Sequence, residues 1–453
     1  MQAVDAQLVL TPSGTDAEML MTSAAAARAY ALYGPPSAER KLFSFMTAAG
    51  EVGSGSTLAS GGKHFNRCTP DGNTVPINEY ILGFDAASME VREYAARDVN
   101  GEFTLCDEAV AADMASIFLE TPSAVILLHV VASSKTGGCS MSWPIVKDLT
   151  QLYRRRVIVV VDACQMRSPD ILLQFCIENE YNVLITGSKY YAGSPFSGGV
   201  IFSKICIQEM ESALSHENEE VISSIFPAGF SSYFCKDEYP LRMTNLRSHA
   251  SQKLNVGLWL RWEAALCHME KHALIPAEVR WTAVSKYMTG LEALLTGSLP
   301  TGHTLRCIPS IAAEPVSTII SFQIFSGTKK QYLNHAELQH LHKVLTLDLT
   351  SLQINSDEDL NSDKEQDDVV LSQRCILGQP VKLNAEKSVV RIAVSATMII
   401  TMCLNEENKL LSTIESDACI EVLLQQDAIL LQKLSWILSH WEITASYVLE
   451  GNL

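Results

Sequence analysis

The sequence predicts an α/β fold, with a mostly parallel, doubly wound sheet in a large domain and a smaller α+β C-terminal domain. Short apolar, β-branched runs such as Val125–Val131 and Val157–Val161 have the length of buried strands. Helical patterns alternate with such runs up to Phe202, as in parallel sheets. Polar residues follow several of the runs, at the strand ends where open α/β sheets place their ligand sites.

Each element is expected from its local pattern. Strands are expected at the apolar runs Gln7–Leu10, Leu42–Thr47, Val125–Val131, Val157–Val161, Val183–Ile185, Gly199–Phe202, Thr318–Phe325 and Val389–Val394. Helices are expected at Ala17–Tyr33, Met89–Ala96, Asp107–Phe118, Ile207–Leu214, Asn255–His268, Ala336–Leu345 and Ala418–Leu438. A further helix is expected to follow the Gly/Ser-rich stretch Gly50–Thr57 and to end near His64, and the polar segment Asn66–Asn78 predicts a loop.

A chain of 453 residues exceeds the usual size of one domain. We expect a large domain over residues 1–250, a linking helix over 251–275 and a small domain over 276–453. Residues 355–368 (NSDEDLNSDKEQDD) are strongly acidic and have no apolar face, which predicts a disordered insertion or a surface loop. A metal site there is disfavoured because the carboxylates lack a turn glycine and ligand spacing, and no metal is expected.

The composition excludes several classes of protein. The net charge of −17 argues against nucleic acid as a partner, because binding phosphates needs clustered Lys and Arg. The sequence contains neither an apolar stretch long enough to span a membrane nor a recognisable signal peptide. The twelve cysteines are scattered without a C-x-x-C pair, which indicates reduced thiols and a cytoplasmic protein.

Two polar strand ends dominate the sequence. The run Val157–Val161 ends in Asp162-Ala163-Cys164-Gln165, and the run Val183–Ile185 ends in Thr186-Gly187-Ser188-Lys189. An acid and an amine so placed suggest pyridoxal phosphate (PLP), because a lysine forms a Schiff base with its aldehyde and an aspartate pairs with its pyridinium nitrogen. Taken singly, Asp162 could be a helix N-cap and Lys189 a solvated loop residue.

Asp-x-x-Gln followed by Ser/Thr-Gly-x-Lys, with the lysine 27 positions after the aspartate, resembles the PLP-dependent fold-type I enzymes. The pattern is most similar to their class V aminotransferase and cysteine desulfurase branch. The resemblance implies an aspartate aminotransferase-like fold, a homodimer with its sites at the interface, and a small amino acid as substrate. It also implies the following roles: Asp162 on the ring nitrogen, Ala163 against a ring face, Gln165 on the phenolic oxygen, Thr186 and Ser188 on the phosphate, and Lys189 as the Schiff-base lysine.

The turn Thr11-Pro-Ser-Gly-Thr-Asp-Ala-Glu18 enters a helix and presents backbone N–H groups to an anion. In the family this turn holds the cofactor phosphate, and Gly14, Thr15 and Asp16 match it. The alternative is an ordinary N-cap by Thr15 or Asp16. Relatives carry several dozen residues before the turn, an N-terminal arm that we expect to be missing here.

Three further positions follow from the resemblance. At the end of Val125–Val131, Ser134 is expected to contact the cofactor, with Ser133 and Lys135 as alternatives. Many relatives stack a histidine on the ring at the place that Glu51 occupies here. His64 either takes over that stacking or is a surface residue at a helix end.

Arg391 lies in the apolar strand Val389–Val394, which resembles the small-domain strand whose arginine binds the substrate carboxylate. A structural salt bridge is the alternative. Cys375, 16 residues earlier, has a spacing similar to that of a desulfurase nucleophile, but its neighbours do not match, and a strand cysteine is favoured.

The predicted function is a PLP-dependent reaction on a small amino acid, with Lys189 as general base or acid. Transamination is expected first, then desulfuration or another lyase reaction, then decarboxylation. A catalytically impaired homologue is the non-enzymatic alternative.

Overall fold

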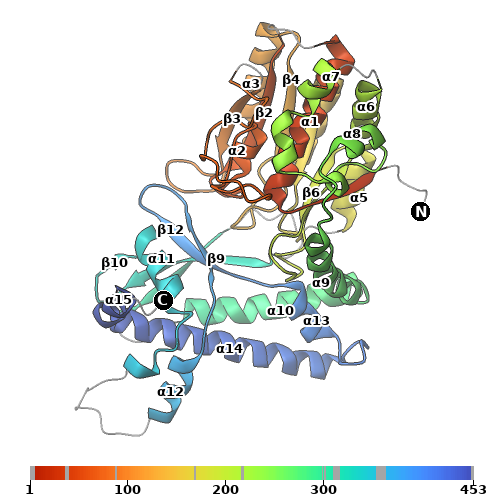
Figure 1. Ribbon diagram of the computed structural model, residues 1–453. Helices are drawn as coiled ribbons and strands as arrows, with labels where there is room; N and C mark the ends of the chain where they lie inside the picture. Colours follow the sequence, from red (N-terminus) through yellow and green to blue (C-terminus); the bar gives the residue numbers. More distant parts are fainter. Residues whose placement is uncertain are drawn as a thin grey trace. The chain divides into compact units, whose positions relative to one another are not determined.

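The computed structural model describes residues 6–35, 40–86, 89–167, 170–215, 219–297, 299, 302–309, 317–352 and 364–449. The chain forms two compact units. The first comprises Met1–Ala96, Phe103–Glu270 and Ala312–Glu314, and the second comprises Arg97–Glu102, Lys271–Ile311 and Pro315–Leu453. Figure 1 labels many of the elements of both.

The first unit is built on a seven-stranded sheet with the order β1-β7-β6-β5-β4-β2-β3. Its strands are β1 (Gln7–Thr11), β2 (Leu42–Ala49), β3 (Met89–Ala95), β4 (Val125–Val131), β5 (Val157–Asp162), β6 (Asn182–Thr186) and β7 (Gly198–Phe202). The five adjacent strands β3, β2, β4, β5 and β6 are parallel to one another, whereas β7 is antiparallel to both β6 and β1. The expected mostly parallel sheet is therefore confirmed.

Helices cover both faces of this sheet. Helices α1 (Gly14–Tyr33), α6 (Lys204–Leu214) and α7 (Glu219–Ile225) contribute to the core on one face (Figure 1). Helices α3 (Asp107–Glu120), α4 (Trp143–Tyr153), α5 (Asp170–Glu178) and α9 (Val256–Ala273) contribute to the core on the other. Helix α1 is buried over most of its length, which its many alanines permit. The expected doubly wound architecture is confirmed.

The prediction of a helix at Met89–Ala96 is wrong, because this segment forms the edge strand β3. Its charged residues are paired across the edge: Glu90 with Lys41 and Arg92, and Arg92 with Asp113. Alternating charges are typical of an edge strand and also of an exposed helix, so the local pattern does not separate the two. The short helix α2 (Ser56–Ser60) also ends earlier than expected.

The second unit contains an antiparallel five-stranded sheet with the path β10-β9-β12-β11 and with β8 paired to β9. Its strands are β8 (Thr304–Ile308), β9 (Ile319–Ser326), β10 (Gln331–Tyr332), β11 (Gly378–Lys382) and β12 (Ser388–Ala393). Its helices include α10 (Ala277–Thr296), α11 (His335–Val344), α12 (Lys364–Ser372), α13 (Ala396–Cys403), α14 (Thr413–Ser439) and α15 (Trp441–Leu449). Helices α10 and α14 run side by side, and Gly290 packs against Leu424 (Figure 1).

The acidic segment predicted as an insertion lies largely outside the described residues, which resume at Lys364 with α12. The chain on either side of it is tied to α14. The buried ammonium group of Lys433 donates to the carbonyl oxygens of Leu347 and Gln373. The amide of Leu349 also donates to Leu371 O (3.0 Å). The parts of the chain that precede and follow the acidic segment are therefore held next to each other.

Candidate active site

The acid and the amine that the sequence singles out lie at the same edge of the large sheet. Asp162 ends β5 and is 9% exposed, and its Oδ1 accepts a hydrogen bond from the Cys164 amide (2.9 Å). Lys189 lies in the loop after β6 and is exposed. The charges of both groups affect the pKa of the Cys164 thiol. Burial raises its pKa well above the ordinary value, the Asp162 carboxylate raises it further, and the Lys189 ammonium opposes the shift. Cys164 is therefore a neutral thiol between an acid and an amine.

The loop that carries Lys189 is closed by its own backbone. The amide of Gly187 donates to Ser197 O (2.8 Å), and the amide of Gly193 donates to Gly187 O (3.0 Å). Both glycines lie against Ala265 of α9, where an added β-carbon would come within 2.6 and 2.8 Å of its side chain. This close packing leaves the loop that carries Lys189 little room to shift.

The start of α1 meets the ends of β5 and β6. A β-carbon on Gly14, the first residue of the helix, would lie 2.5 Å from Cys164 Sγ and 3.3 Å from Thr186 Cγ2. Ser13 caps the helix: its hydroxyl accepts from the Asp16 amide (3.1 Å) and its carbonyl from the Ala17 amide (3.1 Å).

Within the described residues, no hydrogen bond is found on the amides of Gly14 and Thr15, the first two residues of the helix. Free amides at a helix N-terminus attract anions. The turn thus offers two donors beside the ends of the strands that carry Asp162 and Thr186.

Asp16 is buried (3% exposed), and its surroundings favour the protonated form of its carboxyl group. Burial raises the pKa of this carboxyl to about 7, Ser13 opposes the shift by hydrogen bonding, and the charge of Glu238 adds to it. Oδ2 accepts from the Ser13 hydroxyl (2.5 Å), while Oδ1 has no partner among the described residues. A carboxyl with a pKa of about 7 is still partly protonated at neutral pH, which reduces the negative charge beside the turn.

The loop after β4 is organised by Glu51, which lies just after β2. Ser134 is fully buried and donates to Glu51 Oε2 (2.6 Å), and the Thr136 hydroxyl donates to the same oxygen. The hydroxyl proton of Ser134, the residue expected to contact a cofactor, is therefore committed to a protein carboxylate. Ser133, the alternative, is 4% exposed, and no partner for its hydroxyl is found in the described chain.

The other predicted cofactor residues lie at the same edge. Ala163 is buried and its amide donates to Leu184 O (3.0 Å), whereas Gln165 and Ser188 are half-buried. Thr186 donates its hydroxyl to Cys164 O (2.7 Å), so a phosphate contact would have to replace this bond. The cofactor residues predicted from the sequence thus all belong to the first unit.

Arg391 belongs to the second unit, in the middle of β12. It is half-buried, and its stem covers Gly378 of β11, which leaves no room there for a β-carbon.

The prediction that Cys375 lies in a strand is wrong, because it follows α12 in an irregular segment. Burial raises the pKa of its thiol while the Lys433 ammonium opposes this.

His64 is engaged by an aromatic neighbour. Its Nδ1 lies 2.7 Å from the Tyr233 hydroxyl, and the two rings stack with centroids 5.9 Å apart. Burial lowers the pKa of His64 and raises that of Tyr233 to about 12. The imidazole is therefore a neutral group with a protein partner.

Sequence reasoning missed a buried pair beneath this edge. Glu18 Oε2 lies 2.7 Å from His129 Nδ1, and the two side chains are 1% and 0% exposed. A signal was present, because a glutamate in the Ala/Met-rich α1 and a histidine in the apolar run Val125–Val131 both require a partner when buried.

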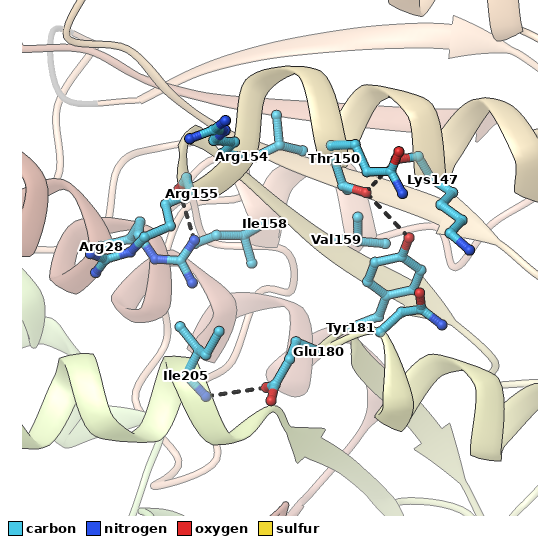
Figure 2. A pocket seen from close by; sticks show the side chains of 13 residues that line it. Arg28, Lys147, Thr150, Arg154, Arg155, Ile158, Val159, Glu180, Tyr181 and Ile205 are labelled. Carbon is cyan, nitrogen blue, oxygen red and sulfur yellow. Dashed lines mark hydrogen bonds between the residues drawn. The ribbon is translucent and has the colours of Figure 1, made fainter.

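A cavity of about 380 Å³ lies at the opposite end of β5, over Val157–Val159 (Figure 2). Its lining includes Arg28 and Arg155, and Arg28 donates to Arg155 O (2.7 Å). Both guanidinium groups bind the carboxylate of Glu209. Because one carboxylate already serves both arginines, we assign this cavity to the packing around an ion pair and not to a reaction.

The sequence matches no family model, and no curated protein matches it significantly. Among solved structures, Catharanthus roseus tryptophan decarboxylase in complex with L-tryptophan is similar, with 11% identity and a TM-score of 0.49 over 95% of this chain and 71% of that one. Oryza sativa TDC with PLP and tryptamine has 9% identity and a TM-score of 0.46 over 95% and 68%. A transaminase from the marine bacterium Virgibacillus has 11% identity and a TM-score of 0.44 over 95% and 76%.

These likenesses assign no activity, and the proposal that follows is argued from the side chains. No described helix has both the length and the apolar content needed to cross a bilayer. No cluster of three or more potential metal ligands from His, Cys, Asp and Glu is found there either.

Proposed function

We propose that this chain is a PLP-dependent enzyme that acts on a small amino acid, with Lys189 as the covalent anchor of the cofactor. One observation carries the proposal. The buried carboxylate of Asp162 and the exposed amine of Lys189 both act on Cys164, which in turn touches the helix N-terminus at Gly14. A cofactor with a basic ring nitrogen, an aldehyde and a phosphate needs an acid, an amine and an anion site of this kind.

The residues at this edge fit the cofactor. The free amides of Gly14 and Thr15 would bind phosphate oxygens, assisted by the helix dipole. Asp16 would not repel the phosphate while its carboxyl is protonated, as a pKa of about 7 permits. The half-buried hydroxyl of Ser188 is a further donor. Asp162 would pair with the ring nitrogen, because a buried carboxylate is matched best by a cation.

When bound, PLP supplies an electron sink for the bond broken at Cα of an amino acid. Lys189, exposed at the end of its loop, would accept or return the proton at that carbon. Ser133 and Gln165 offer hydrogen-bonding groups at the same edge of the sheet. Arg391 would bind the substrate carboxylate with its planar guanidinium.

Within this proposal, transamination of a small amino acid by a class V-like enzyme is the favoured reaction, and a homodimer is the proposed assembly. A desulfurase that uses Cys375 is disfavoured, since burial raises the pKa of this thiol and a neutral thiol is a poor nucleophile. Another lyase reaction or decarboxylation is the competing outcome of the assay.

The test is chemical. Purified protein incubated with PLP and reduced with borohydride should carry one phosphopyridoxyl group, and peptide mapping should locate it on Lys189. Lys189→Ala should lose the label but still bind PLP, with the half-buried Lys63→Ala as a labelled control. A label on another lysine would overturn the proposal. Assaying keto acid, sulfide and CO₂ with a set of amino acids then identifies the reaction.

A further inference from the structure

The cavity over the start of β5 contains more positive charge than its ion pair accounts for. The carboxylate of Glu209 serves Arg28 and Arg155, which explains how these side chains pack. Two further cations line the cavity, Lys147 and Arg154, and no carboxylate partner for either is found among the described residues. The volume of about 380 Å³ lies within the range of small-molecule sites, about 300–1,000 Å³. The cavity can therefore hold a ligand, and the unmatched charge favours an anion.

The floor of the cavity is a notch in the sheet. Strand β6 pairs with β5 from Asn182 opposite Val160 onward, so residues 157–159 of β5 extend beyond the start of β6. These three residues line the cavity, together with Ile205 at the start of α6. All four have apolar side chains, so the floor can take the hydrocarbon part of a ligand out of water.

The two unmatched cations lie on one face of α4. Lys147 is four residues before Gln151, and Arg154 is three residues after it, a spacing that places side chains on the same side of a helix. Two helical turns separate Lys147 from Arg154, which is about 10 Å along the helix axis. Figure 2 shows Thr150 between the two cationic side chains. Two anionic groups on one molecule match this separation better than a single ion does.

Arg154 occupies an unusual backbone position. Its φ of 51° and ψ of −130° describe a conformation that glycine adopts readily and other residues rarely. Of the three consecutive arginines, Arg155 binds Glu209, and Arg156 lies over the ring of Phe118 (4.1 Å). Within the described chain, no partner is found for the side chain of Arg154. An arginine thus stands where the backbone favours glycine and where no described protein group uses its charge.

The dipole of α4 does not explain both cations. A helix C-terminus favours positive charge, but the effect is confined to the last turn. Arg154 directly follows the helix, whereas Lys147 is the fifth of its eleven residues. The acidic residue of the lining, Glu180, already accepts a hydrogen bond from the Ile205 amide (3.3 Å). The charge of Lys147 therefore remains available to a ligand.

We propose that this cavity is a second binding site, for a small organic molecule with an anionic group at each end, such as an α,ω-dicarboxylate. One end binds the ammonium group of Lys147, and the other binds the guanidinium group of Arg154, whose planar fork suits a carboxylate. The hydrocarbon body lies on the apolar floor of residues 157–159. The site is at the end of β5 opposite to Asp162, so the inference does not depend on the proposed function.

The test is calorimetric titration of protein that has first been incubated with PLP and reduced with borohydride, so that the proposed cofactor site is filled. The probes are suberate, the shorter dicarboxylate succinate, and octanoate, which has the chain length of suberate but only one carboxylate. One suberate should bind per chain, about tenfold more tightly than either other probe, because only suberate reaches both cations. Succinate binding as tightly as suberate, or no binding of suberate, would overturn the inference.

Variants locate the binding. Lys147→Ala and Arg154→Ala should each lower the affinity for suberate about tenfold, to the level of octanoate, because one anchor is lost. The matched control is Arg242→Ala, an exposed arginine outside the cavity, which should leave all affinities unchanged. Melting temperatures should be the same in all variants, because the replaced side chains are exposed.

Unchanged suberate affinity in both cavity variants would place the ligand elsewhere and overturn the inference. If the wild type carries no phosphopyridoxyl group after reduction, the proposed function falls. The same titration of the unlabelled protein then still decides whether the cavity binds suberate.

Discussion

Gly14 and Cys164 touch, although 150 positions separate them in the chain. Gly14 opens α1, Cys164 follows β5, and a β-carbon on the glycine would stand 2.5 Å from the thiol sulfur. Contacts of that length do not occur between unbonded carbon and sulfur, so one of the two residues must remain small. The contact fixes the distance between the proposed phosphate turn and the strand that carries Asp162.

Gly14→Ala should therefore lower both stability and PLP affinity. Overpacking of this kind costs about 1–3 kcal/mol, which urea unfolding can measure. In the background of Cys164→Ala, where the sulfur is gone, adding Gly14→Ala should cost much less stability than it does in the wild type. A loss that persists in the double variant would contradict the steric explanation.

Asp162→Asn should leave the fold intact and abolish most of the turnover. An asparagine can still accept the hydrogen bond from the Cys164 amide through its side-chain oxygen, but it cannot balance a cationic nitrogen. We expect a fall in kcat on the order of a hundredfold or more, with melting temperature nearly unchanged. Turnover close to that of the wild type would exclude Asp162 as the partner of the ring.

Arg391→Lys tests the substrate carboxylate. A lysine cannot reproduce the two parallel hydrogen bonds of a guanidinium, so kcat/KM should fall roughly ten- to over a hundredfold, or about 1.5–3 kcal/mol. Arg306→Lys, in an exposed position of β8 in the same sheet, is the matched control and should change little. If Arg391→Lys instead lowers the melting temperature and leaves kinetics unchanged, Arg391 is a structural residue.

Asp16 predicts a pH dependence of stability. Its carboxyl has a pKa of about 7 in the folded chain and about 4 when unfolded. Between these values the folded state holds the extra proton, so stability falls as the pH rises from about 4 to 7 and levels off above. Asp16→Asn removes this dependence. Its advantage over the wild type, measured without cofactor, should grow by about 2–4 kcal/mol between pH 5 and pH 8. A constant difference would show that Asp16 does not titrate in that range.

Glu209→Gln should destabilise the first unit strongly. The Arg28 side chain is 6% exposed and its counter-charge is Glu209, so the change leaves a buried cation unbalanced, at a cost of about 3–5 kcal/mol. Arg155 also binds Glu209 but is 53% exposed, and Arg155→Gln should cost at most about 1 kcal/mol. Similar losses in the two variants would contradict the role given to burial.

The sheet could be predicted where burial alone shapes the sequence. Strands β4 and β5 are buried at every position, and both appear as continuous apolar runs with the expected bounds to within one residue. Strand β3 could not be predicted, since its polar positions are satisfied by Lys41 and Asp113, which are distant in sequence. A single segment contains no information about such partners.

The same distinction applies to the site. Asp162 and Lys189 could be placed at one edge because each ends a recognisable strand, and parallel strands end together. Their roles stay predictions. The pairing of Glu18 with His129 and the engagement of Ser134 by Glu51 could not be foreseen, because both depend on the three-dimensional register of α1, β2 and β4.

The clamp of Lys433 on Leu347 and Gln373 has a practical consequence for protein engineering. One ammonium group on α14 donates to both carbonyl oxygens, so replacing Lys433 would leave two carbonyl groups without this donor. Any redesign of the chain between Leu347 and Gln373 must therefore leave Lys433 untouched.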